Sequence, residues 1–263
     1  MSGPIRIGLA GATGRMGQAI IQAIGEAEGM TLGPCMGRPE CAGQTAGGVT
    51  LVGPDALLAG GEVIIDVSTP AAAVVLAQAA AARGGPALVI GATGFSQDEL
   101  EALEACAARV PLLRSGNFSL GVNLLLGLVE QAARALEAAD WDIEIFEAHH
   151  RRKVDAPSGT ALMLGEAAAR GRGVELKAVE DRGRDGLTGP RQTGAIGFSV
   201  LRGGGIVGEH SVTFAGAAET LILAHSARDR SLFAQGAVTA ARWAAGQPPG
   251  LYEMVDVLGL RAG

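Results

Sequence analysis

Residues 5–17 read IRIGLAGATGRMG, and this stretch decides the fold of the chain. Ile5–Ala10 is a short apolar run that predicts a buried strand, and Gln18–Glu28 predicts a helix. Three glycines stand in the turn between them with the spacing GxxGxxG, a variant of the GxGxxG fingerprint of dinucleotide-binding proteins. The stretch therefore predicts the first strand and helix of a nucleotide-binding sheet.

Each glycine of this turn has a separate physical use. Gly11 permits a tight turn after the strand, Gly14 lets the backbone approach a pyrophosphate, and Gly17 allows the helix to pack close to the strand. The helix N-terminus attracts the negative charge of the phosphates. In a chain with 41 glycines such a spacing also arises by chance, but its place between strand and helix favours a dinucleotide site.

The first half of the chain continues this alternation of short apolar runs and Ala-rich segments. The alternation is typical of a parallel sheet with helices on both faces, a Rossmann-like doubly wound α/β fold. The predicted strands are Met30–Met36, Val63–Val67 and Ala87–Ile90, and the predicted helices are Ala71–Arg83 and Gln97–Arg109.

The pattern changes near Ser119, where we expect a second, α+β domain with a mostly antiparallel open sheet. A helix at Ser231–Ala245 then returns the chain to the first fold. We therefore expect a dinucleotide-binding domain at residues 1–119, completed by residues 231–263, and a second domain at residues 120–230. The expected helices of the second domain are Leu120–Ala139 and Ser158–Arg170, and its expected strands are Asp142–Glu147, Ala195–Arg202, Gly208–Ala215 and Glu219–Ala227.

Composition excludes several classes of protein. Of the 263 residues, 48% are hydrophobic, too many for a disordered chain, and the glycines have no three-residue period, which excludes collagen. The longest near-apolar run, Ala71–Ala82, is shorter than the roughly 20 residues of a membrane span. No secretory signal is visible at the N-terminus, and a net charge of −6 argues against general nucleic-acid binding.

The three cysteines bear on location and on metal binding. Cys35, Cys41 and Cys106 are odd in number, and their spacing matches no metal site. We therefore expect reduced thiols in a cytoplasmic protein, and no metal. Because Cys106 lies within a predicted helix and no base stands beside it, we interpret it as a packing residue.

The end of the second predicted strand bears on the choice of cofactor. An acid that binds the ribose usually follows the glycine turn by about 20 residues. Here the sequence reads Met36-Gly37-Arg38-Pro39-Glu40, with Arg38 where the acid is expected. An arginine there can accompany a 2′-phosphate, so we expect NADPH to be used at least as well as NADH. Two alternatives stay open: Glu40 reaches the ribose, or Arg38 is simply solvated.

A second segment with chemical character is EAHHRRKVDAPSGT at residues 147–160. Five consecutive residues that can be cationic, His149 to Lys153, stand in a chain of net negative charge. Ser158 then opens a helix as its N-cap, where a hydroxyl and backbone N–H groups form an anion site. Cations beside a helix N-terminus favour a small ligand with several negative charges, such as a dicarboxylate. A histidine or lysine beside that ligand can donate a proton.

Other interpretations of this segment carry less weight. A basic run is commonly a solvated surface or a nucleic-acid patch, but here it is joined to a capped helix and a cofactor domain. A metal site with two adjacent histidines is disfavoured because neighbouring residues of a strand point to opposite faces.

Five segments together resemble the 4-hydroxy-tetrahydrodipicolinate reductase family, also called dihydrodipicolinate reductase. The resemblance covers nearly the whole chain and rests on GATGRMG, GATGF at Gly91–Phe95, SGNFSLGVN at Ser115–Asn123, EAHHRRKVDAPSGTA, and GIVGEHSVTFAG at Gly205–Gly216. The resemblance implies NAD(P)H-dependent reduction of (hydroxy)dihydrodipicolinate to tetrahydrodipicolinate, on the diaminopimelate route to lysine. It also implies a homotetramer that associates through the second domains, which bind the substrate.

The resemblance assigns roles to residues of this chain, motif by motif. His149 is implied as proton donor or acceptor and Lys153 as a second proton donor. The residues implied to grip the substrate carboxylates are His150, Ser158, Gly159 and Thr160. The residues implied to hold NADPH or NADH are Gly11, Ala12, Thr13, Gly14, Arg15, Met16 and Arg38, with Gly91, Ala92, Thr93, Ser115, Gly116, Asn117 and Phe118 at the nicotinamide end.

One position departs from the family pattern, and one rival function stays open. Many members have Glu immediately before the arginine equivalent to Arg38, whereas this chain has Gly37, so a strict preference for NADH is not expected. The rival is a non-catalytic regulator that senses redox state by binding NAD(P)H. Such a regulator would keep the glycine turn but would have no use for residues 149–160.

Overall fold

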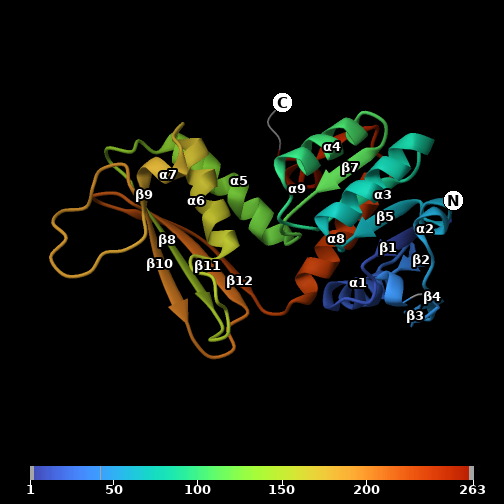
Figure 1. Cartoon of the computed structure of the whole chain (residues 1–263). Helices are drawn as coiled ribbons and strands as arrows, with labels where there is room; N and C mark the ends of the chain where they lie inside the picture. The colour runs from blue at the N-terminus through green and yellow to red at the C-terminus, as the bar shows by residue number, and fades with distance from the viewer. Residues whose placement is uncertain (1–2, 42, 261–263) are drawn as a thin grey trace. The chain divides into compact units, whose positions relative to one another are not determined.

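The computed structural model describes residues 3–41 and 43–260; the ends of the expected first domain, residues 1–2 and 261–263, lie outside the described residues. The chain divides into two units (Figure 1). Unit 1 comprises residues 1–120 and 231–263, and unit 2 comprises residues 121–230. Among the described residues, no helix combines the length and the apolar character that crossing a membrane requires.

Unit 1 is built on a six-stranded sheet in the order β13-β7-β6-β5-β1-β2, and every adjacent pair is parallel. This confirms the predicted doubly wound sheet. The strands are β1 (Ile5–Ala10), β2 (Met30–Met36), β5 (Val63–Asp66), β6 (Ala87–Ile90), β7 (Pro111–Arg114) and β13 (Gly250–Tyr252), and a separate hairpin contains β3 (Thr45–Ala46) and β4 (Val49–Thr50).

Helices cover both faces of the unit 1 sheet, because strand side chains alternate between the two faces. Ile7 and Ile65 lie in a core with α1 (Arg15–Glu26) and α8 (Ser231–Ala244), and Ile64 and Ile90 lie in a second core. That second core includes α2 (Pro54–Gly60), α3 (Pro70–Arg83) and α4 (Gln97–Ala107). The remaining helices are η1 (Pro39–Cys41) and α9 (Met254–Val257).

Local sequence explains where several helices begin. Helix α1 starts three residues earlier than predicted because Gly14 is its N-cap. Thr69 caps α3 by accepting from the Ala72 N–H at 3.4 Å, with Pro70 at the first helical position. Helix α4 begins with a capping box formed by Ser96 and Glu99.

Unit 2 packs α5 (Leu120–Ala135) and α6 (Gly159–Gly171) on one face of a five-stranded sheet. The strand order is β12-β11-β8-β10-β9, with α7 (Leu176–Val179) before β9. The strands are β8 (Asp142–His149), β9 (Glu180–Asp181), β10 (Ile196–Arg202), β11 (Gly208–Ala215) and β12 (Thr220–Ala227).

The unit 2 sheet is mixed. Strand β11 pairs antiparallel with both β8 and β12, whereas β10 pairs parallel with both β8 and β9. The long segment between β9 and β10 has no apolar periodicity that would reveal its return direction. Hence the sequence indicates an antiparallel majority, while the structure shows two pairings of each kind.

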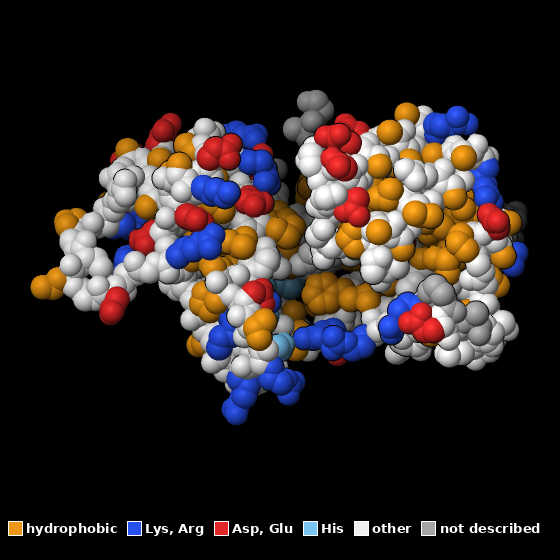
Figure 2. Space-filling model, in the orientation of Figure 1, with side chains coloured by type: hydrophobic (Ala, Val, Ile, Leu, Met, Phe, Trp, Pro, Cys, Tyr) orange, Lys and Arg blue, Asp and Glu red, His pale blue; other side chains and the backbone are white. Residues whose placement is uncertain are grey.

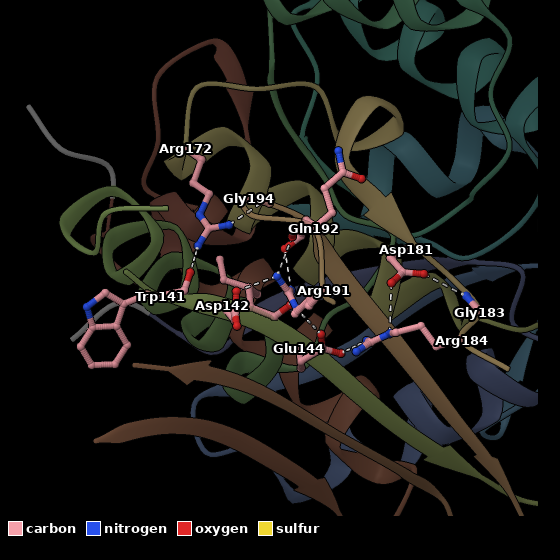
Figure 3. A network of polar contacts seen from close by, with 12 residues as sticks. Trp141, Asp142, Glu144, Arg172, Asp181, Gly183, Arg184, Arg191, Gln192 and Gly194 are labelled. Carbon is pink, nitrogen blue, oxygen red and sulfur yellow. Dashed lines mark hydrogen bonds and ion pairs between the residues drawn. The ribbon is translucent and has the colours of Figure 1, made fainter. Parts of the chain in front are cut away.

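An arginine network ties that segment to β8 (Figure 3). Arg191 donates from Nε to Glu144 Oε1 at 2.9 Å and from Nη1 to Asp142 Oδ1 at 2.7 Å. Arg184 donates to the other oxygen of Glu144, and Arg172 donates to the Trp141 and Gly194 carbonyls. Both ends of the segment are thereby held at the start of β8.

Candidate active site

The glycine turn of unit 1 needs glycine for steric reasons. Gly11 has a φ of +81°, and the N–H groups of Gly11 and Ala12 donate to the Met36 carbonyl at 3.0 Å. A Cβ placed on Gly17 would lie 2.3 Å from the Gly11 carbonyl oxygen. Because Gly14 caps α1 without a side chain, the first-turn N–H groups of that helix are available to an anionic ligand.

A cavity of about 760 Å³ opens at this turn. Its volume suits a nucleotide-sized ligand. The cavity lies at the carboxyl ends of β1, β2 and β5, where the strand order changes direction and where open α/β sheets bind ligands. It is lined by Gly11, Thr13, Gly14, Met36, Gly37, Arg38, Leu51, Val52, Gly53, Pro54, Val67, Ser68, Thr69 and Ala72.

Arg38 stands at the edge of this cavity with its side chain 79% exposed. Its Nη1 lies 3.3 Å from Glu40 Oε1, so the cation and the acid considered in the sequence are paired with each other. A Cβ on Gly37 would lie 3.0 Å from Leu51 Cδ1 and 3.1 Å from Thr13 Cγ2. The position before Arg38 is therefore crowded, and an acidic side chain does not fit there without movement.

The sites expected at the nicotinamide end follow β6 and β7. A Cβ on Gly91 would lie 2.6 Å from the Phe118 ring, and a Cβ on Gly116 would lie 3.6 Å from the Thr93 methyl carbon, so the two loops lie together. Ser115 donates from Oγ to the Asn117 carbonyl at 2.7 Å. The cavity lining includes none of Ala12, Arg15, Met16, Gly91, Ala92, Thr93, Ser115, Gly116, Asn117 and Phe118.

Sequence reasoning missed the loop after β5. Asp66 is fully buried and accepts from the N–H of Ser68 at 2.8 Å and from its hydroxyl. Burial raises the pKa of Asp66, and the two bonds from Ser68 oppose this rise. These bonds hold the loop in which Ser68 and Thr69 line the cavity. A cap residue followed by Pro70, directly after a predicted strand, was the signal that could have revealed this loop.

In unit 2, His149 is the last residue of β8, and Glu147 shares its face because side chains alternate along a strand. His149 Nδ1 lies 2.7 Å from Glu147 Oε2. The other carboxylate oxygen, Oε1, accepts from the Ser158 backbone N–H at 2.8 Å. Glu147 therefore joins the predicted proton donor to the predicted anion-binding turn.

Arg202 grips the same carboxylate in a bidentate manner. It is the last residue of β10 and stands opposite His149 in the parallel register. Its Nη1 and Nη2 donate to the two oxygens of Glu147, each at 2.7 Å. Burial alone would raise the pKa of Glu147, but the bonds from Arg202, His149 and Ser158 outweigh it and lower the pKa. Glu147 is therefore a buried anion at neutral pH.

His210 completes this cluster from β11. Its ring lies edge-on to His149 with centroids 5.1 Å apart, and its Nε2 lies 3.1 Å from Ser158 Oγ. Burial, followed by the charge of His149, lowers the pKa of His210 to about 4, so the ring is neutral at neutral pH. Ser158 is the predicted N-cap of α6, since its Oγ accepts from the Ala161 N–H at 3.2 Å. Gly159 and Thr160 form the first turn of this helix.

Lys153 and His150, from the 149–153 run, each have a polar side-chain partner. Lys153 Nζ lies 2.8 Å from Asp155 Oδ2, and this bond is the main reason that the pKa of Asp155 is lowered. His150 Nε2 lies 3.3 Å from Arg230 Nη2. Figure 2 shows Lys and Arg side chains gathered at the tip of unit 2 where β8 and β10 end. The structure thus gathers His149, His150, Lys153 and Ser158 at one end of the sheet.

Four members of the cluster escaped sequence reasoning: Glu147, Arg202, His210 and Arg230. Only Glu147 carried a local signal, namely an acid two residues before a histidine in a predicted strand. Arg202 and His210 come from distant strands that the register brings beside β8, and Arg230, which follows β12, contacts His150. Within the described ranges, no group of three or more His, Cys, Asp or Glu residues is placed to hold a metal ion.

Comparison with known proteins gives consistent matches along both units. The family model for the N-terminus of dihydrodipicolinate reductase matches residues 5–118, and the model for its C-terminus matches residues 121–258. A 4-hydroxy-tetrahydrodipicolinate reductase from Caulobacter vibrioides is 59% identical over 99% of this chain and 100% of the relative. One from Roseobacter denitrificans is 50% identical, with full coverage of both chains.

A solved structure shows the same fold at low sequence identity. The dipicolinate-bound dihydrodipicolinate reductase from Paenisporosarcina sp. TG-14 has a TM-score of 0.80 and 22% identity, covering 96% of this chain and 98% of its own. Two family models that together match most of the chain, and relatives of high identity along its full length, give one conclusion: the chain belongs to the dihydrodipicolinate reductase family.

Proposed function

We propose that the chain is an NAD(P)H-dependent 4-hydroxy-tetrahydrodipicolinate reductase of the diaminopimelate route to lysine. The observation that carries the proposal is His149, whose Nδ1 is held by the buried anion Glu147 beside the cation-rich N-terminus of α6. Full-length relatives of up to 59% identity carry the same name. A regulator that only binds NAD(P)H has no need for this cluster.

The anion-binding turn is proposed to hold a small dicarboxylate. Ser158, Gly159 and Thr160 offer a hydroxyl and the N-terminus of a 13-residue helix, which carries partial positive charge. Arg230, placed beside His150, supplies the positive charge for a second carboxylate. A relative of this fold binds dipicolinate, which is such a dicarboxylate.

The cradle of unit 1 fits a nicotinamide dinucleotide, because Gly11 and Gly17 let the turn pack against backbone that a Cβ would meet, and the Gly14 cap leaves the first-turn N–H groups of α1 for the phosphates. When bound, the cofactor supplies a hydride. The cavity residues Gly11, Thr13 and Gly14 would hold its phosphates, and the loops 91–93 and 115–118 would hold its nicotinamide end. We propose that NADPH is used at least as well as NADH, since Arg38 lines the cavity and the residue before it is Gly37 and not an acid.

The proton is proposed to come from His149, with Lys153 as a second donor. The ionised Glu147 accepts from Nδ1, so the doubly protonated ring would give its Nε2 proton to the ligand and become the neutral Nδ1–H ring. The Lys153 ammonium is held by Asp155 rather than by the ligand site, so it must leave this ion pair to act.

We further propose a cytoplasmic homotetramer. Phe146, Leu201 and Ile222 are exposed on the sheet face of unit 2 that is turned away from α5 and α6. An apolar patch of this kind favours association between copies. Analytical ultracentrifugation would show a particle with four times the mass of the chain, and Ile222→Glu would reduce it. Cell fractionation tests the location.

The function is tested by oxidation of NADPH and NADH in the presence of substrate. Because the substrate is unstable, it is made in situ from pyruvate and aspartate semialdehyde by the preceding synthase. We expect oxidation that depends on the synthase and on both of its substrates. Binding of NADPH without any oxidation would instead favour the regulator.

A further inference from the structure

Both carboxylate oxygens of Glu147 accept two hydrogen bonds each, and the side chain is only 1% exposed. Oε2 accepts from His149 Nδ1 and from Arg202 Nη1, and Oε1 accepts from the Ser158 N–H and from Arg202 Nη2. All four distances lie between 2.7 and 2.8 Å. Two of the four bonds come from Arg202, and the other two tie the carboxylate to His149 and to the N-cap residue of α6.

An ionised carboxylate can only accept hydrogen bonds, so the proton of the neutral His149 ring must sit on Nδ1. The opposite nitrogen, Nε2, faces Gly208 on β11, where a Cβ would come within 3.1 Å of it. Glycine at this position therefore leaves the Nε2 side of the ring uncrowded. The geometry fixes both which nitrogen is held and which is presented.

The groups around the His149 ring come from every neighbouring element. Glu147 lies on its own strand, Arg202 on β10 and His210 on β11, while Lys153, on the loop after β8, acts on His210. Arg202 is committed to Glu147, and Lys153 is held by Asp155. His210 is neutral at neutral pH, because burial lowers its pKa to about 4. Glu147 is therefore the group that acts on the ring directly.

We propose that Glu147 is a positioning residue that keeps the neutral His149 ring in the Nδ1–H form and fixes the anion-binding turn through Ser158. Arg202 holds the carboxylate for both tasks. The assignment rests on the proposed reductase function for its kinetic consequence, but the state of the ring is measurable without any turnover. The buried Glu147 thus determines both which nitrogen of the neutral His149 ring carries the proton and where the anion-binding turn lies.

Glu147→Gln provides a sharp test because glutamine has one oxygen instead of two. The Ser158 backbone N–H can only donate, whereas a neutral imidazole can switch which nitrogen carries its proton. The amide oxygen is therefore expected to stay with Ser158 and Arg202 Nη2, and the amide NH₂ to face His149, while Arg202 Nη1 loses its partner on the side chain. The ring then accepts at Nδ1 and carries its proton on Nε2.

The experiment is ¹⁵N NMR of the histidine rings in the full chain, combined with steady-state kinetics. The wild type is expected to show Nδ1–H for neutral His149, and Glu147→Gln to show Nε2–H. The kcat of the variant should fall about 100-fold while the substrate KM changes less than about threefold. Glu147→Asp keeps an acceptor-only carboxylate and should restore Nδ1–H with an intermediate kcat.

Glu144→Gln is the matched control, since Glu144 lies on the same strand and is also held by two arginines, but touches no histidine. It should leave the ring and kcat unchanged. If the neutral His149 ring of the wild type carries its proton on Nε2, the proposal is wrong. This outcome does not depend on whether the variants fold. Equal rises in KM and losses in kcat with an unchanged ring would reduce Glu147 to a structural role. Absence of turnover in the wild type would refute the reductase function alone.

Discussion

At the sheet edge of unit 1, Gly11 and Gly17 are needed because they have no side chain, since a Cβ at position 17 would meet backbone. At the sheet end of unit 2, Glu147, His149 and Arg202 work through charges that they carry. The first site is a shape made by the backbone, and the second is an arrangement of side-chain protons and charges. Substitutions should therefore damage binding in unit 1 and chemistry in unit 2.

The largest effect is expected from His149→Gln, which removes from unit 2 the ring proposed to exchange a proton. Loss of a general acid or base typically lowers turnover about 100-fold or more. The dissociation constant for NADPH, measured by fluorescence titration, should stay within about twofold, because the cradle belongs to unit 1. An equal loss of turnover and of NADPH binding would contradict the proton-donor assignment.

Gly17→Ala is the corresponding test in unit 1, where it changes the shape of the glycine turn. The new Cβ would press on the Gly11 carbonyl, so α1 must move away from the turn, and NADPH affinity should fall about 30-fold. Gly25→Ala is the control, because it lies in the same helix and its Cβ meets nothing within 4 Å. This control should bind NADPH normally and raise the free energy of unfolding by about 0.5–1 kcal/mol.

Arg38→Ala sharpens the comparison, because Arg38 is a charged side chain in the shape-based site. If it accompanies a 2′-phosphate, the KM for NADPH should rise about tenfold more than the KM for NADH. The exposure of the side chain limits the effect. Steady-state kinetics with both cofactors give the ratio of the KM for NADPH to the KM for NADH. An unchanged ratio would mean that Arg38 is simply solvated.

The smallest effect concerns the stability of unit 2 as a function of pH. The pKa of His210 is lowered from 6.5 to about 4, so between these values the unfolded chain binds a proton that the folded chain does not. Stability is therefore full above about pH 6.5 and falls as the pH drops towards 4. The loss from this group between pH 6.5 and 5.5 is about 1 kcal/mol.

Urea unfolding measures this slope. The chain has two tryptophans, and in a Trp243→Phe background the remaining Trp141 reports on unit 2. His210→Gln should reduce the slope between pH 6.5 and 5.5, whereas His150→Gln, which changes a less buried histidine, should leave it in place. An identical slope in the His210 variant would show that other groups cause it.

The sequence predicted what is local and periodic. The bounds of β1, β2 and β11 agree with the predicted ranges, because apolar runs between glycines or charged residues mark these strands clearly. The short helix α2 and the strand β7, which begins at Pro111, were not predicted, since each is short and has no periodic signal of its own. The parallel placement of β10 depends on a long segment held by side-chain bonds.

The same distinction applies to the candidate sites. His149, Lys153 and Ser158 lie within one segment of the sequence, so charge and capping patterns could identify them together. Arg202 is 55 residues from Glu147, and His210 is 52 residues from Ser158. Their contacts arise from the register of β8, β10 and β11, and no single-sequence pattern encodes that register.

The placement of α8 has a consequence for how the protein is made. Ala234, Ala237 and Ala241 lie in the core of unit 1, and a Cβ on Gly236 would clash with the Phe118 carbonyl. Helix α8 therefore packs closely against the rest of unit 1. Unit 2 is contiguous in sequence and lies entirely before this helix. On the ribosome, unit 2 can therefore complete its core while unit 1, whose first strand is synthesised earliest, waits for the last part of the chain.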